Sequence, residues 1–164
     1  SSMLGGMDKY KRSAMMLQNY LNHKELYGEF FFERISDALP DILCSQLFID
    51  TGLGFKEEQS LLRHIGNKGI GRIEFDLNGF DGIRKIRFDP INDYAAVRID
   101  EITVHTESGG CKKITDYRHN GIAKSNYLLF VTDDPQIYIN FENIEKPEKL
   151  TVSLNFIAIG IAEI

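Results

Sequence analysis

The stretch RIEFDLNGFDGIRKIRFDP, residues 72–90, decides the fold class of this chain. Every second residue from Ile73 to Leu77 is apolar, and Ile86 and Phe88 repeat this pattern after two turn dipeptides. Such alternation is typical of strands that bury one face. Asn-Gly and Asp-Gly favour tight turns, and the final proline stops the second strand. The stretch therefore predicts two short strands joined by turns.

The same pattern continues on both sides of this stretch. Alternation or a compact apolar run is found in residues 46–50, 97–106, 127–131, 137–141 and 150–156. The phase changes within residues 97–106, which predicts a β-bulge near Asp100 and Glu101. Eight or nine strands are expected, with no helices between them to make parallel crossovers. We therefore expect a mainly β chain with two packed antiparallel sheets, a β-sandwich.

The first part of the chain differs in pattern. Residues 8–26 contain no proline or glycine, and their apolar residues fall at helical spacing, which predicts an amphipathic helix. Residues 29–39 predict a second, shorter helix that Pro40 ends. We therefore assign residues 1–44 to a tag remnant and a helical lead-in or linker, and residues 45–164 to the β-sandwich domain.

Composition narrows the class of protein. Hydrophobic residues make up 43% and charged residues 26%, as in ordinary globular domains. The net charge of −5 and the absence of a basic stripe argue against nucleic-acid partners. No apolar run is long enough to span a membrane, and no signal peptide is visible. Cys44 and Cys111 are expected as free thiols in a reducing compartment, with a disulfide between them as the alternative.

Five segments occur in a suggestive order: QLFIDTGLGFKEEQSL (46–61), IEFDL (73–77), KIRFDPIND (85–93), VRIDEITV (97–104) and FVTDDPQIYI (130–139). They resemble a jelly-roll module appended to bacterial glycosyltransferases and methyltransferases of surface-polysaccharide synthesis, including rhamnan-synthesis proteins. The resemblance is most distinctive at RFDP. It implies a galactose-binding-like jelly roll that binds carbohydrate or polysaccharide without catalysis, beside catalytic domains of its parent enzyme. It also implies a bacterial cytoplasmic location, at the membrane surface if the parent is held there.

The candidate ligand-binding residues come from the sequence itself. Residues 116–120 form the densest mixture of aromatic and hydrogen-bonding groups, and they adjoin a turn. Aromatic rings stack on the apolar face of a sugar, while polar side chains bind its hydroxyls. The predicted contacts are Tyr94, Asp116, Tyr117, Arg118 and Asn120. Phe80 and Tyr138 are further aromatic loop candidates, and the alternative for all of them is ordinary core or surface packing.

A cation site is a second possibility. Asp89, Asn92 and Asp93 offer the oxygen ligands that Ca²⁺ prefers, so a structural Ca²⁺ is one interpretation of this turn. The other is purely structural: Arg87 and Asp89 point to one face and pair, while Pro90 fixes the turn. No other cofactor is predicted.

The sequence predicts no catalytic residues. Asp133 and Asp134 precede a proline, and glycoside hydrolysis needs two carboxyls opposed across a cleft, which adjacent turn residues rarely provide. The histidines show no metal-binding spacing, and no serine lies in a nucleophile elbow. Two alternatives to a carbohydrate-binding module remain. One is a structural or oligomerisation domain that docks on its parent enzyme or forms a homo-oligomer through the helix of residues 8–26. The other is a small glycoside hydrolase.

Overall fold

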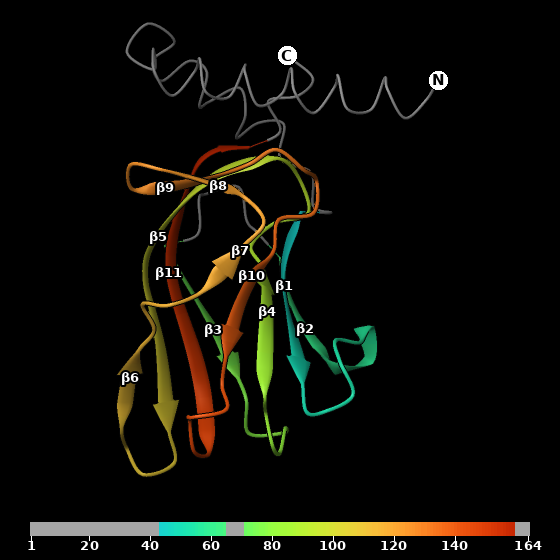
Figure 1. The fold of residues 1–164 in the computed structure, drawn as a ribbon, viewed down its shortest axis with the longest axis vertical. Helices are drawn as coiled ribbons and strands as arrows, with labels where there is room; N and C mark the ends of the chain where they lie inside the picture. The colour runs from blue at the N-terminus through green and yellow to red at the C-terminus, as the bar shows by residue number, and fades with distance from the viewer. Residues whose placement is uncertain (1–42, 65–70, 160–164) are drawn as a thin grey trace, which may run out of the picture.

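The computed structural model describes residues 43–64 and 71–159, which form two antiparallel β-sheets around one hydrophobic core (Figure 1). The mainly β class predicted from the alternation is confirmed. Both predicted helices, at residues 8–26 and 29–39, lie outside the described residues.

One sheet has five strands in the order β2-β1-β4-β10-β7. Its strands are β1 (Cys44–Asp50), β2 (Ser60–His64), β4 (Lys85–Asp89), β7 (Arg118–His119) and β10 (Ile137–Asn140). A single 3₁₀ turn, η1 (Glu57–Gln59), precedes β2.

The other sheet has six strands, with the order β3-β11-β5-β9-β8 and β6 paired to β5. Its strands are β3 (Arg72–Asp76), β5 (Ala95–Thr106), β6 (Cys111–Lys113), β8 (Ile122–Lys124), β9 (Tyr127–Phe130) and β11 (Pro147–Ile159).

The chain passes repeatedly from one sheet to the other, for example at β3–β4, β4–β5, β9–β10 and β10–β11. Some neighbours within a sheet are therefore distant in sequence, as β4 and β10 are, whereas others such as β1 and β2 are consecutive. The connections that follow β3, β5 and β10 all lie at the lower end of the molecule in Figure 1. This topology gathers three separate turns at one end.

Alternation places the core between the sheets. Phe75 of β3 and Phe88 of β4 are both fully buried, and their ring centroids are 5.9 Å apart at an interplanar angle of 70°. This edge-to-face contact joins the two sheets, because each strand belongs to a different one. Burial of each such side chain contributes about 1.5–3 kcal/mol.

The predicted bulge is present. Opposite β11, Ser153 pairs with Glu101 and Leu154 pairs with Ile99, so Asp100 is the extra residue. The additional residue shifts the phase of β5, which lets Val97 and Ile102 both be buried although they are an odd number of positions apart.

The described residues contain eleven strands, more than the eight or nine expected. The strands that the sequence did not indicate are β2, β6, β7 and β8, which have two to five residues and little alternation. Cys44 and Cys111 are free thiols on different sheets, as expected. Among the residues described, no helix has the length and apolar character needed to cross a membrane.

Candidate functional site

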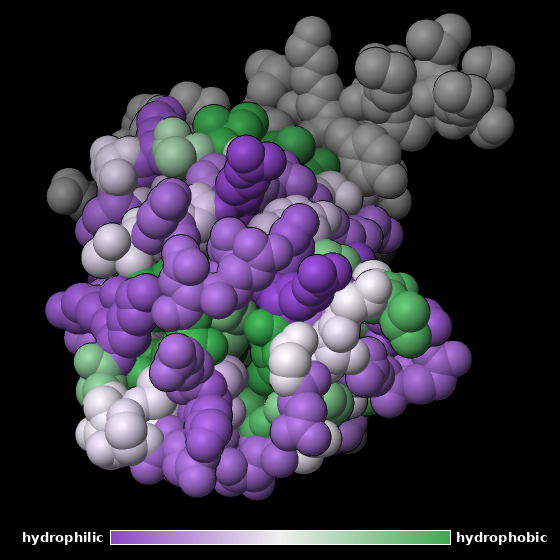
Figure 2. All heavy atoms as spheres, turned by 60° about the horizontal axis from the view of Figure 1, so that its bottom comes forward, coloured by the Kyte–Doolittle hydropathy of each residue, from purple (hydrophilic) through white to green (hydrophobic). Residues whose placement is uncertain are grey.

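A hollow of about 740 Å³ lies at the end of the sandwich where the three turns meet. We call it the end hollow. It is lined by Leu77, Asn78, Phe80, Asp81, Gly82, Ile83, Arg84, Glu107, Glu142, Ile144, Lys146, Pro147 and Glu148. Figure 2 looks towards this end and shows apolar surface recessed within a hydrophilic surround.

The floor of the end hollow is apolar and anchored in the core. Leu77, Ile83 and Ile144 are buried. The backbone N–H of Leu77 donates to the carbonyl of Glu148 at 2.8 Å, which ties the turn after β3 to the start of β11. Gly82 has φ of +68°, a left-handed conformation that suits glycine, so it lets the chain turn back between Asp81 and Ile83.

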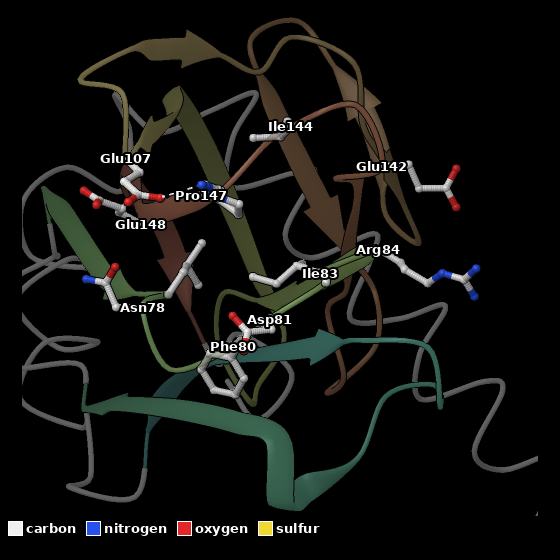
Figure 3. Close-up of a pocket in the computed structure, with 13 residues that line it drawn as sticks. Asn78, Phe80, Asp81, Ile83, Arg84, Glu107, Glu142, Ile144, Pro147 and Glu148 are labelled. Atoms are coloured by element: carbon white, nitrogen blue, oxygen red, sulfur yellow. Dashed lines mark ion pairs between the residues drawn. The ribbon is translucent and has the colours of Figure 1, made fainter.

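The rim is polar and comes from all three turns. Figure 3 shows Glu107 and Glu148 together on one side, Arg84 and Glu142 on the opposite side, and Phe80 beside Asp81 between them. Lys146 Nζ lies 3.5 Å from a carboxylate oxygen of Glu107, so this ion pair links two of the turns. The rim thus combines a half-buried aromatic ring with charged groups.

Several rim side chains have unused hydrogen-bonding capacity. The side chains of Asn78, Asp81 and Glu148 make no hydrogen bond or ion pair to any described residue. Pockets that bind small ligands usually have volumes of about 300–1,000 Å³, mostly apolar walls and a few polar groups. The end hollow has this size, but its walls are more polar than is usual, with an apolar floor and a charged rim.

A second hollow of about 200 Å³ lies on the outer face of the five-stranded sheet, beside the RFDP motif. Arg87 Nε and Nη2 donate to the two carboxylate oxygens of Asp89, each at 2.9 Å. The guanidinium of Arg87 also lies 4.1 Å from the ring centroid of Phe48. The pairing of Arg87 with Asp89 predicted from the sequence is confirmed.

Burial governs the ionisation of Asp89. Removal from solvent raises the pKa of this carboxyl to about 6, even though the hydrogen bonds and charge of Arg87 favour the ionised form. The carboxylates of Asp134 and Glu57 raise the same pKa further. Cys44 lines the same hollow, and burial likewise raises its pKa.

The register of the strands places further side chains beside this ion pair on the outer face of the five-stranded sheet. Phe48, Arg87, Tyr138 and Arg118 stand opposite one another in a row across β1, β4, β10 and β7. Tyr138 hydrogen-bonds to Gln136, whose side-chain amide donates to Asp134 at 2.8 Å. Arg87, Asp89, Tyr138, Gln136 and Asp134 therefore have partners on this face, and its hollow is smaller than a typical ligand pocket.

The residues predicted as ligand contacts do not line the end hollow. Asn120 instead bridges two connections: its Nδ2 donates to the carbonyl of Asp134 and its Oδ1 accepts from the N–H of Gln136. Arg118 and Asp116 are exposed, and Tyr117 packs half-buried against the core.

Tyr94 is half-buried as well, and its backbone N–H donates to Asp93. Ligand binding by Tyr94 and by residues 116–120 stays a prediction. Of the aromatic loop candidates, Phe80 lies in the end hollow.

The three predicted calcium ligands are held by different partners. Both oxygens of Asp89 accept from Arg87, Asn92 Oδ1 accepts from the N–H of Cys44 at 3.1 Å, and Asp93 accepts from the N–H of Tyr94. Within residues 43–64 and 71–159, no three His, Cys, Asp or Glu side chains form a group that could hold a metal ion. A structural Ca²⁺ stays a prediction.

Sequence reasoning missed the charged rim of the end hollow. Glu107, Glu142 and Glu148 belong to no motif, and up to 41 positions separate them in the sequence. The signal available in the sequence is indirect: Glu107 and Glu142 lie in connections between strands, and Glu148 lies at the start of β11. Only the order of the strands brings those turns to one end. In comparisons with known proteins, no family model, curated protein or solved structure matches this chain.

Proposed function

We propose that this chain is a non-catalytic carbohydrate-binding module of the jelly-roll, galactose-binding-like type, an accessory to a polysaccharide-synthesis glycosyltransferase or related enzyme. The observation that carries the proposal is the end hollow. It combines an apolar floor, a half-buried Phe80 and polar side chains without partners, on a scaffold of two packed sheets.

These components match the chemistry of a sugar. A pyranose ring has an apolar C–H face that packs on aromatic and aliphatic surface, here Phe80 and Ile83. Its hydroxyls both donate and accept hydrogen bonds. Asn78 offers donors and an acceptor, and the carboxylate of Asp81 offers acceptors. Since these side chains have no partner among the described residues, a bound sugar satisfies them without breaking an existing bond.

The chain passes repeatedly between the two sheets, so that many consecutive strands lie in different sheets. This arrangement supports the jelly-roll assignment. The RFDP motif also has a clear role in this architecture. Arg87 and Asp89 form an ion pair on the outer face of β4. The carbonyl of Pro90 accepts a hydrogen bond from the hydroxyl of Ser45 at 2.6 Å. These features fit the resemblance to modules of polysaccharide-synthesis enzymes.

The hydrolase alternative receives no support from the acidic pair that suggested it. Asp133 and Asp134 do not line the end hollow. Asp89, whose pKa is raised, holds both its oxygens in the ion pair with Arg87 rather than facing a second carboxyl across a cleft.

Calorimetric titration with soluble polymers rich in rhamnose, galactose or glucose tests the proposal. Phe80→Ala should weaken binding by about threefold to tenfold, the value of one aromatic stacking contact. Arg118→Ala is the matched comparison, because it alters the patch predicted from sequence and leaves the end hollow intact. No binding of any polymer at millimolar concentration would overturn the proposal. A loss with Arg118→Ala but not with Phe80→Ala would move the site to residues 116–120.

The docking alternative rests on a different observation. Leu53, in the turn after β1, and Leu62, on β2, are 76% and 50% exposed, so both offer apolar surface for a partner. Light scattering of the wild type and a Leu53→Ser, Leu62→Ser variant tests self-association. A monomeric mass for both proteins would remove oligomerisation through this hairpin.

A further inference from the structure

The rim of the end hollow carries an excess of negative charge. Lys146 is engaged with Glu107. This leaves the carboxylates of Asp81, Glu142 and Glu148 against one guanidinium, that of Arg84.

The charge of Arg84 is also shared with a group outside the hollow. The pKa of Asp50 is lowered chiefly by the hydrogen bond from the N–H of Gly52, and the positive charge of Arg84 contributes to the same effect. The rim therefore presents a net negative potential to whatever enters. The chain as a whole has a net charge of −5, which acts in the same direction.

Resting on the proposed function, we infer that the end hollow selects glycans that carry protonated amino sugars and rejects acidic ones such as uronates. An ammonium group has three donors and no acceptor, so it needs oxygen acceptors that are not already occupied. Asp81 and Glu148 provide such acceptors, from the turn after β3 and the start of β11 respectively. Hydrogen bonds between ammonium and carboxylate are charge-assisted and stronger than neutral ones.

The apolar floor strengthens this selection. A ligand that packs on half-buried Phe80 above this floor excludes water from one side of the carboxylates, which lowers the local dielectric and increases their attraction for a cation. The same effect increases the repulsion of a uronate carboxylate. The affinity of the hollow should therefore depend on the charge of the ligand, even among ligands whose sugar rings make equivalent apolar contacts.

The test compares three oligosaccharides of equal length by calorimetric titration at pH 6: a glucosamine oligomer, its N-acetylated counterpart and an oligogalacturonate. The glucosamine oligomer should bind tightest, and 0.5 M salt should reduce that advantage by screening. Asp81→Asn and Glu148→Gln should each weaken its binding about twofold to fivefold, as expected for an exposed ion pair, and should weaken binding of the N-acetylated oligomer less. Glu145→Gln is the matched control, because Glu145 is exposed in the same connection but does not line the hollow.

The outcomes separate this inference from the proposed function. If the N-acetylated or neutral oligomers bind as tightly as the glucosamine oligomer, the charge selection is wrong and the carbohydrate-binding function stands. The same holds if oligogalacturonate binds as tightly, or if Glu145→Gln matches the effect of Glu148→Gln. If neither these oligosaccharides nor the neutral polymers bind, both proposals fail together.

Discussion

Asp89→Asn should remove a pH dependence of stability that the wild type shows between pH 4 and 6. The folded protein holds the Asp89 carboxyl at a pKa of about 6, against an ordinary value of 3.8, because burial disfavours its charge. A raised pKa means that the folded state binds the proton more tightly than the unfolded state does. The group therefore contributes stability that is fully present below pH 3.8 and is lost as the pH rises through 6.

The magnitude follows from these two values. The full shift corresponds to about 3 kcal/mol, at about 1.4 kcal/mol for each pKa unit. Lowering the pH from 7.5 to 5.0 recovers about 1.4 kcal/mol of this amount. The side chains of Arg87 and Asp89 are only 20% and 12% exposed, so solvent screening reduces the effect modestly. We expect a gain of about 1 kcal/mol or slightly more from this one carboxyl.

Urea unfolding followed by circular dichroism at both pH values measures the effect, since the chain contains no Trp. Other carboxyls add a background that all variants share, so the informative quantity is the change with pH in the variant relative to the wild type. Asp100→Asn is the control. Asp100 pairs with Arg98 two positions away, as Asp89 pairs with Arg87, but these side chains are 42% and 40% exposed.

Asp89→Asn should be less stable than the wild type at pH 7.5, because Arg87 loses its counter-charge, but this offset does not affect the comparison. The wild type and Asp100→Asn should gain equally on acidification, and Asp89→Asn should gain about 1 kcal/mol less. An equal gain in all three proteins, or a larger gain in Asp89→Asn, would show that burial does not dominate the ionisation of Asp89.

Three further predictions concern the scaffold, each measured by urea or thermal unfolding. Phe88→Ala should cost about 3–5 kcal/mol, because it deletes a fully buried ring in contact with Phe75; a cost below 1 kcal/mol would contradict the assigned core. Ser125→Gly should stabilise by about 0.5–1 kcal/mol, since Ser125 has φ of 52° at the first position of the two-residue β8–β9 turn, where glycine is favoured. Gly121→Ala should destabilise by about 1–3 kcal/mol, because the added Cβ would lie 2.9 Å from the ring of Phe130.

The parts of the fold that were predictable are those in which burial is periodic. Ile73 and Phe75, and then Ile86 and Phe88, alternate because one side of each strand faces the other sheet. Even the bulge at Asp100 was visible, since an extra residue must reverse the phase of the pattern. Strands such as β6 and β7 were not predictable, because their residues are mostly exposed and the pairing with a longer neighbour creates them.

The candidate site was less predictable for a related reason. The prediction of Phe80 as a loop aromatic placed one residue of the end hollow, but Asp81 and Glu148 line the same hollow only because β3 and β11 are neighbours in the sheet. Residues 116–120 had the composition of a binding patch. The register of β7 with β10 places Arg118 on the outer face, and Asn120 hydrogen-bonds to the backbone of a neighbouring turn, neither of which the composition indicated. Composition identifies candidate groups, and topology decides which of them converge.

The end hollow also shows how turn residues can be fixed without being buried. Exposed Asn78 directly follows Leu77, which is fully buried and bonded through its N–H to the backbone of Glu148. Asp81 is separated by one glycine from buried Ile83. The backbone beneath each rim side chain is therefore held by the core, and a ligand needs to order only the side chains, which lowers the entropic cost of binding. Because the anchors and the rim are different residues, the rim can change its charge, and with it the preferred ligand, while the sandwich keeps its core.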